Sequence, residues 1–235
     1  MKKKLQVFIS STFTDMVKER QAAVEAILNA GHIPTGMEQF NPGDEPQKKL
    51  ISRWINEADV YLLILGGRYG SIDSETGNSF THWEYNYAGE TGLPRFALVM
   101  EEDAIEEKAR SIGIWTTERE NYPKYREFRT QVLEKISRMF SDTKDIQLAV
   151  TQKLAELEKD KHLNGWIPAK DIPNVTELEM ELSKLKTENE QLKIMLKTFQ
   201  ATPTIQPNRV KGDYLKFLIQ LFRVTKGRLN TIVSM

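Results

Sequence analysis

The sequence predicts a doubly wound α/β domain, with a five-stranded parallel sheet in the order 2-1-3-4-5, followed by a parallel dimeric coiled coil. Three observations lead to this prediction. Short apolar runs alternate with segments of helical periodicity over residues 1–168, as in parallel α/β folds. The run Val60–Leu65 is apolar throughout, which is expected of a central strand buried on both faces. A heptad repeat begins at Val175.

Each strand is predicted where an apolar run of strand length stops at a polar or glycine-rich turn. The expected strands are 4–10, 32–34, 60–65, 95–100 and a short one around 138–140. Apolar residues recur at helical spacing between them, so the expected helices are 16–28, 47–58, 80–90, 125–136 and 145–159. The segment 101–122 is acidic and lacks a clear apolar period, and we expect it to be irregular. Right-handed crossovers then give the strand order.

The composition narrows the classes of function. Lys and Arg together number 33, as do Asp and Glu, so no overall field favours nucleic acid or an anionic membrane. Cysteine is absent, which excludes disulfides, thiolate catalysis and Cys-ligated zinc, and fits a reducing compartment. The chain shows no secretory signal and no apolar run of about 18 residues. We therefore expect a soluble, cytoplasmic protein with neither nucleic-acid nor membrane partners.

Polar residues follow the first and third predicted strands where each strand ends. Residues 10–12 (Ser-Ser-Thr) follow the first strand, and Gly66–Gly70 (Gly-Gly-Arg-Tyr-Gly) follows the third. Glu84 lies in the first turns of the next predicted helix. Ligands of open α/β sheets bind at the carboxyl ends of the strands, where the strand order reverses. We therefore expect a nucleotide-sized pocket at this edge.

The reaction that suits a lone carboxylate there is cleavage of an N-glycosidic bond. Its transition state resembles an oxocarbenium ion, which Glu84 would stabilise or capture. Nicotinamide leaves NAD without needing a proton, whereas an ordinary base would need a second acid such as Asp73 or Glu38. The three histidines do not have metal-ligand spacing, and the chain has no phosphate-binding loop or dinucleotide fingerprint. No metal or cofactor is expected, and NAD is the expected substrate. The histidines are His32, His82 and His162.

Each of these features also has a purely structural explanation. Ser and Thr cap helices, glycines permit tight turns, and a carboxylate near a helix start is favoured by the helix dipole. Taken singly, capping and the dipole explain residues 10–12 and Glu84 better than a binding site does. The convergence of all three segments at one sheet edge is what favours a site.

The run Val7–Arg20 (VFISSTFTDMVKER) resembles the start of a TIR-like family known as a domain of unknown function, number 4062. The resemblance continues through 36–38, 59–61, 67–70 and Ser79–Tyr85, and ends at Gly165-Trp166. It covers residues 5 to about 168. It implies a flavodoxin-like fold related to TIR domains and to nucleoside 2-deoxyribosyltransferases. Members of the family often stand at the front of signalling and anti-phage defence proteins.

In both related groups a glutamate on the helix after the third strand carries the chemistry, and Glu84 occupies that place. The resemblance also implies that Gly36–Pro46 is a mobile loop beside the site. Gly67 stands where Trp is common in the family, which removes an aromatic wall from the pocket. Together the strand-end pattern and the resemblance predict a set of nucleotide-binding residues: Phe8, Ser10, Ser11, Thr12, Glu38, Gly66, Gly67, Arg68 and Tyr69.

The segment 174–200 shows the pattern of a two-stranded parallel coiled coil. Its a and d positions are Val175, Leu178, Leu182, Leu185, Asn189, Leu192, Leu196 and Phe199. A buried Asn at an a position specifies two strands, and Glu181 and Glu188 at g would face Lys186 and Lys193 at e of the partner. The other possibility is an amphipathic helix docked on its own domain. We predict a homodimer through residues 175–199, and higher oligomers remain open.

The last two segments are a linker and an apolar helix. Residues 201–211 hold two prolines and no apolar period, and residues 212–235 are apolar almost all round over their first half. Two functions of different class follow from the whole chain. The first is a TIR-like nucleotide hydrolase that cleaves the N-glycosidic bond of NAD or a related nucleotide, and the second is a non-enzymatic signalling or scaffold module.

Overall fold

The computed structural model describes residues 3–36, 46–135, 137–171 and 174–201, together with three residues further on, Tyr214, Lys216 and Phe217. The chain divides into two compact units, Met1–Ile172 and Pro173–Met235.

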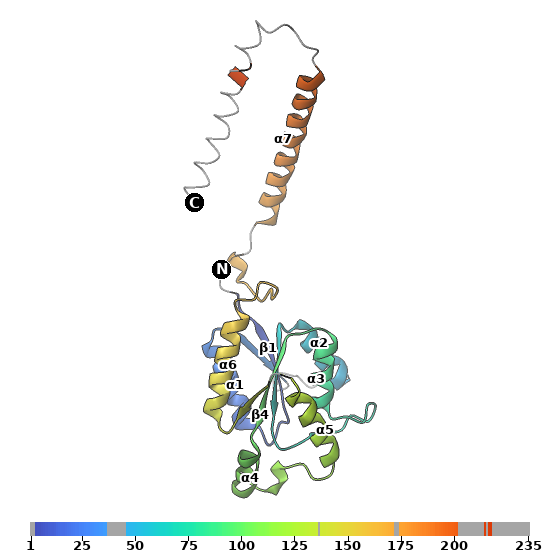
Figure 1. Ribbon diagram of the computed structural model, residues 1–235, viewed down its shortest axis with the longest axis vertical. Helices are drawn as coiled ribbons and strands as arrows, with labels where there is room; N and C mark the ends of the chain where they lie inside the picture. Colours follow the sequence, from blue (N-terminus) through green and yellow to red (C-terminus); the bar gives the residue numbers. More distant parts are fainter. Residues whose placement is uncertain are drawn as a thin grey trace. The chain divides into compact units, whose positions relative to one another are not determined.

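The first unit is built on a five-stranded sheet (Figure 1). Its strands are β1 (Gln6–Ser10), β2 (Ile33–Gly36), β3 (Val60–Leu65), β4 (Arg95–Met100) and β5 (Ser137–Phe140). All neighbouring pairs are parallel, in the order β2-β1-β3-β4-β5. The predicted sheet, its order and its short fifth strand are confirmed.

Helices cover both faces of the sheet (Figure 1). One face carries α1 (Val17–Asn29) and α6 (Thr143–Leu157), which pack against each other. The other face carries α2 (Gln47–Glu57), α3 (Phe80–Glu90) and α5 (Tyr122–Leu133). The side chains of β3 are buried along its whole length because both faces are covered, as the unbroken apolar run predicts.

The core accordingly consists of two apolar clusters, one on each face of the sheet. Alternate residues of a strand point to opposite faces, so Ile9 joins the cluster under α1 and α6, whereas Phe8 joins the cluster under α2, α3 and α5. Ser10 shares the face of Phe8 by the same alternation. This places its hydroxyl on the side of α3.

The expectation of irregular structure over 101–122 was wrong for its first half. Residues Glu102–Ser111 form helix α4, which is followed by a short 3-10 helix, η2 (Ile114–Thr116). No residue of α4 is fully buried, and only Ala104 and Ile105 pack against the core, so its apolar stripe is too short to reveal the helix in an acidic segment. Its acidic first turn and basic last turn suit the helix dipole, and Arg110 pairs with Glu106 one turn away.

The end of the first unit is tied to its beginning. Lys4 and Trp166 form an isolated antiparallel bridge, with each backbone amide donating to the carbonyl of the other residue. The Asp59 carboxylate accepts hydrogen bonds from the backbone amides of Gln6 and Gly165. These contacts lie at the amino-terminal edge of the sheet, where β1 and β3 begin. A further short 3-10 helix, η3 (Ala169–Asp171), follows.

In the second unit, residues Val175–Ala201 form one long helix, α7. Its apolar side chains are exposed, including Leu182 at 53% and Leu196 at 60%. The predicted linker lies outside the described residues except for Ala201, which belongs to α7. The predicted helix over 212–235 also lies outside them, apart from the three residues named above. Within the described chain, no helix is long and apolar enough to cross a membrane.

Candidate functional site

The candidate site lies at the carboxyl edge of the sheet, where the strand order reverses. The strands β1 and β3 are neighbours in the sheet. The chain leaves β1 for α1 on one face and arrives at β3 from α2 on the other face. Open α/β sheets bind ligands beyond the carboxyl ends of the strands at such a point. The segments that follow β1 and β3 therefore decide what this edge can hold.

Ser10 and Glu84 meet inside the domain at this edge. Ser10 is the last residue of β1, and its Oγ donates a hydrogen bond of 2.5 Å to Glu84 Oε2. Glu84 lies in the second turn of α3, whose N-cap is Ser79, the side chain of which accepts a hydrogen bond from the His82 amide. Both side chains are buried, and Glu84 is only 2% exposed.

Burial sets the charge of Glu84. Loss of water raises the pKa of its carboxyl to about 7, and the Ser10 hydroxyl and the positive charge of Arg20 lower it by less. The carboxyl therefore titrates near neutral pH and can occur there as an acid or as an anion. Shifted acids of this kind concentrate at functional sites.

An aromatic wall adjoins this pair. The ring of Phe8 stacks on Tyr61 with 5.9 Å between centroids, and Tyr61 meets the edge of Tyr85. The Tyr61 hydroxyl is buried without a hydrogen bond of normal geometry among the described residues. Burial raises the pKa of Tyr61 well above its ordinary value, and the negative charge of Glu84 adds to this effect. Phe8 thus lies in the layer beneath the acid, as part of the core.

Ser11 and Thr12 take different directions from Ser10. The Ser11 Oγ accepts a hydrogen bond of 2.9 Å from Arg20 Nη1, and Thr12 packs against Gly70. Arg20 is buried on α1 and places a positive charge near Glu84. The sequence analysis did not identify Arg20 as a site residue, although Arg20 ends the Val7–Arg20 run. The available signal was its place among the mostly apolar residues on the inner face of α1.

The two glycines after β3 serve close packing. A Cβ atom on Gly66 would collide with Met16 Sδ. A Cβ atom on Gly67 would lie 2.8 Å from the backbone oxygen of Thr116, in the segment that follows α4. The volume next to Gly67 is therefore filled by η2 and its flank, so the aromatic side chain common at this position in the family has no room here.

Arg68 and Tyr69 point to different surroundings. The Arg68 Nη1 donates to Thr14 Oγ1 at 3.3 Å, which joins the segments after β3 and β1. The Tyr69 side chain is buried, with its hydroxyl 2.8 Å from His82 Nδ1 and its ring against Phe128. Tyr69 thus packs between α3 and α5, and the structure does not bring it to the Glu84 carboxyl. Glu38 lies outside the described residues.

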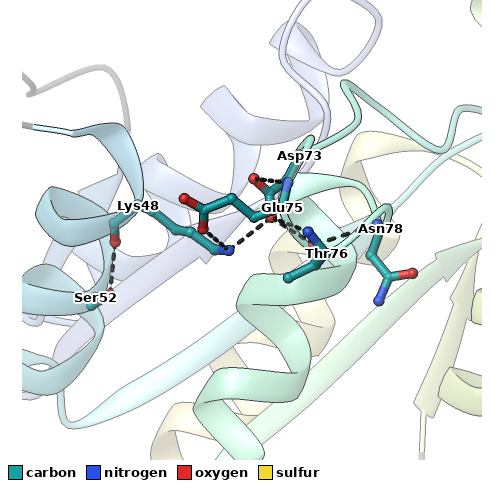
Figure 2. Close-up of polar contacts among 6 residues, drawn as sticks. All are labelled: Lys48, Ser52, Asp73, Glu75, Thr76 and Asn78. Carbon is teal, nitrogen blue, oxygen red and sulfur yellow. Dashed lines mark hydrogen bonds and ion pairs between the residues drawn. The ribbon is translucent and has the colours of Figure 1, made fainter.

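Asp73 is held as an anion by a lysine from another element (Figure 2). Lys48, on α2, places its Nζ 2.7 Å from Asp73 and 3.1 Å from Glu75, and the Thr76 hydroxyl also donates to Asp73. The hydrogen bond from Lys48, and after it the hydrogen bond from Thr76, hold the pKa of Asp73 well below its usual range. Asp73 carries no proton at neutral pH, and this makes it a poor general acid.

Hollows open at several places on the described surface of this unit, among them the following three. One, of about 280 Å³, lies beside β2 and is lined in part by Phe13, Arg20 and Thr35. A second, of about 370 Å³, lies between α1 and α4, and a third adjoins the amino-terminal edge. Glu84 lines none of the three. Among the described residues, no group of three or more His, Asp or Glu side chains could hold a metal ion.

These observations define the protein as a flavodoxin-like α/β domain with a buried acid at the carboxyl edge, joined to a long exposed helix. The model of the family described as "Domain of unknown function (DUF4062)" matches residues 6–155, and the chain belongs to that family. A search of the curated proteins gave no match.

A search of the solved structures gave matches at low identity. The TIR domains in the structure of the activated Roq1 resistosome directly recognizing the pathogen effector XopQ are 12% identical over 66% of this chain and 99% of theirs, with a TM-score of 0.44. A mutant flavo di-iron protein from Thermotoga maritima is 16% identical over 67% of this chain and 37% of its own, with a TM-score of 0.39. Similarities at these TM-scores say nothing about the activity of this chain.

Proposed function

We propose that the protein is a nucleotide hydrolase that cleaves the N-glycosidic bond of NAD or a related nucleotide, with Glu84 as the reacting carboxylate. The observation that carries this proposal is the hydrogen bond from Ser10 to Glu84, which fixes a buried acid at the end of β1. A carboxylate in such surroundings stabilises a developing positive charge strongly because little water screens it.

The proposed reaction needs one carboxylate and no general acid. The bond between the anomeric carbon and the nicotinamide nitrogen breaks, and its electron pair neutralises the cationic ring. Glu84 stabilises or captures the resulting oxocarbenium-like carbon. Water then adds its oxygen to that carbon and releases a proton to solvent; where Glu84 has captured the carbon, the bond between them breaks in this step and the carboxylate is restored. A leaving group that departs without a proton suits this site because Asp73 is paired with Lys48 and holds no proton to give.

Substrate can reach Glu84 only after the groups around it move, because its side chain is 2% exposed. We infer that the closed arrangement is a resting form. Signalling or anti-phage defence, the settings suggested by the resemblance, would be consistent with an enzyme that is opened by an activating event.

The test is release of nicotinamide from NAD by the full-length chain. Glu84→Gln keeps the shape and removes the charge, so it should lower the rate by at least about a hundredfold. Glu90→Gln is the matched control, since Glu90 is an exposed residue of the same helix. Equal rates for Glu84→Gln and the wild-type protein would refute the catalytic assignment.

We also propose that α7 pairs two copies of the chain in parallel through residues 175–199. The exposed apolar stripe on α7 favours this, because helices in proteins are stabilised mostly by the packing of an apolar face. Truncation after Lys170 should give a folded monomer with reduced activity. Light scattering that still shows a dimer would move the interface to the α/β domain.

The second candidate is a signalling or scaffold module without turnover. The complete burial of Glu84 favours it, since an enzyme site is usually open to its substrate. Nucleotide binding to the full-length chain without release of nicotinamide, under every oligomeric condition tested, would support this candidate over the hydrolase.

A further inference from the structure

Arg20 is a charged residue inside the fold, on the opposite face of the sheet from Glu84. It belongs to α1 and is only 4% exposed, among mostly apolar residues on the inner face of that helix. Glu84 lies on α3, which covers the other face. A guanidinium stays charged at physiological pH, so its burial is costly unless hydrogen bonds or opposite charges offset the cost. The contacts of Arg20 show what this buried charge does.

Arg20 contacts the residues on both sides of Ser10. Its Nη1 donates to the Ile9 carbonyl at 3.4 Å and to the Ser11 Oγ at 2.9 Å. The two serine hydroxyls take opposite directions, since Ser11 turns toward α1 whereas Ser10 turns toward Glu84 on α3. Arg20 therefore holds the end of β1 from one face of the sheet, and the hydroxyl that bonds to the buried acid leaves this end on the other face.

The charge of Arg20 also acts across the sheet. It favours the carboxylate form of Glu84, in opposition to burial, which favours the acid. This attraction acts through the interior of the protein, where charges are screened less than in water. Glu19, the neighbour of Arg20 on α1, is paired with Lys108 of α4.

The other ionisable groups on the elements around Glu84 do not take this role. Burial keeps several of them neutral at physiological pH: Tyr61 on β3, and His82 and Tyr85 on α3. The guanidinium of Arg95, on β4, lies over the Tyr85 ring, 4.1 Å from its centroid. Among the described residues, Arg20 is the cation whose charge lowers the pKa of Glu84.

We propose that Arg20 is a positioning residue for the reaction proposed above: it holds the end of β1 from the α1 face, and its charge keeps Glu84 in the carboxylate form that reacts. The inference rests on that proposed function. Arg20 acts without touching the substrate, through the placement of Ser10 and through the electrostatic potential at Glu84. Without Arg20, burial would hold Glu84 as an acid over more of the physiological pH range.

Two substitutions separate the charge of Arg20 from its hydrogen bonds. Arg20→Gln keeps a donor for the end of β1 and removes the charge, whereas Arg20→Lys keeps the charge. The rise of nicotinamide release with pH should move to higher pH in Arg20→Gln, by roughly half a pH unit or more, and should stay close to its wild-type position in Arg20→Lys. A purely structural role would lower the rate or the stability without separating the two midpoints. Lys18→Gln is the matched control, because it removes the same charge from an exposed position of α1.

A second measurement does not depend on turnover. Glu84→Gln removes the titrating group, so the stability that this change gains between pH 5 and pH 8 reports the pKa of Glu84 in the folded state. Loss of the Arg20 charge raises that pKa further above its value in the unfolded chain. The gain should therefore be larger in the Arg20→Gln chain than in the wild-type and Arg20→Lys chains. Urea titrations of the full-length chain measure the gain, and near-UV circular dichroism verifies that each variant is folded.

The two measurements distinguish failure of this proposal from failure of the hydrolase. If the wild-type chain releases no nicotinamide, the hydrolase fails, and the urea titrations still decide whether Arg20 controls the charge of Glu84. An equal gain from Glu84→Gln in the wild-type and Arg20→Gln chains would overturn the role of Arg20, whether or not the chain is active. Equal shifts in Arg20→Lys and Arg20→Gln would also overturn it, because hydrogen bonding and not charge would then be the cause. Failure of both variants to fold would restrict Arg20 to a structural role.

Discussion

Ser10 and Glu84 lie 74 positions apart in the chain, and the hydroxyl of Ser10 donates to the Glu84 carboxylate inside the domain. The contact forms because β1 ends under the second turn of α3. Burial and this one hydroxyl oppose each other in setting the pKa of Glu84, which lies at about 7. Small changes at either residue should therefore alter the charge of the site at physiological pH.

The first prediction concerns the dependence of the rate on pH. If Glu84 reacts as a carboxylate, the rate of nicotinamide release should rise with pH through about 7. Ser10→Ala removes a hydroxyl that lowers this pKa, so the rise should move to higher pH. In Ser11→Ala the midpoint should stay in place, because Ser11 bonds to Arg20. A rate that falls with pH over this range would instead assign Glu84 as a proton donor.

The second prediction concerns stability. Folding raises the pKa of Glu84 from 4.5 to about 7, so the folded state prefers the protonated acid. This contribution is complete below about pH 4.5 and is lost as pH rises through 7, by about 3 kcal/mol in the free energy of unfolding. Glu84→Gln should lack the loss, so its advantage over the wild-type protein should grow from pH 5 to pH 8 in urea titrations. Parallel curves would show that the acid is solvated.

The third prediction concerns Gly67. Its backbone does not require glycine, but a methyl group there would press on the Thr116 carbonyl and on Ile105. Gly67→Ala should therefore cost about 1–3 kcal/mol in the free energy of unfolding through overpacking. Gly92→Ala tests the other effect, since Gly92 has open space but a φ of +74°. No loss in Gly67→Ala would mean that the segment around η2 yields easily.

The fourth prediction concerns α7. The double change Glu181→Lys with Glu188→Lys should lower the melting temperature of the dimer modestly, because each exposed pair contributes only a few tenths of a kcal/mol. The control, Glu177→Lys with Glu190→Lys, makes the same change of charge outside the e and g positions. Asn189→Ile should raise the melting temperature and relax the choice of oligomer. Sedimentation of Asn189→Ile as a strict dimer would contradict a two-stranded register set by Asn189.

The sheet could be predicted because its strands carry strong local signals. Val60–Leu65 is apolar without interruption, and the turn residues after β1 and β3 stand where those strands end. Helix α4 could not be predicted in this way because only Ala104 and Ile105 of its residues pack against the core, and both are only partly buried. The spacing of apolar residues therefore does not indicate such a helix.

Part of the candidate site followed from topology alone. Parallel strands bring their carboxyl ends to one edge, so Ser10 and the segment after β3 could be placed together before the structure. Side-chain direction could not be foreseen. Tyr69 is next to Arg68 in sequence, yet it packs against His82. The pairing of Asp73 with Lys48 joins residues 25 positions apart, which no local pattern indicates.

The buried polar atoms that lack hydrogen bonds are unevenly distributed over the described part of the first unit. Many of them belong to residues near the carboxyl ends of the strands: Thr12, Asp15, Glu19, Thr35 and Arg129. Each such group costs about 1–3 kcal/mol of folding free energy. The opposite edge, where Asp59 satisfies two backbone amides, shows no comparable accumulation among the described residues. The cost of unmet hydrogen bonds in the described domain therefore falls mainly at the carboxyl edge of the sheet, the edge at which a bound ligand could supply the missing partners.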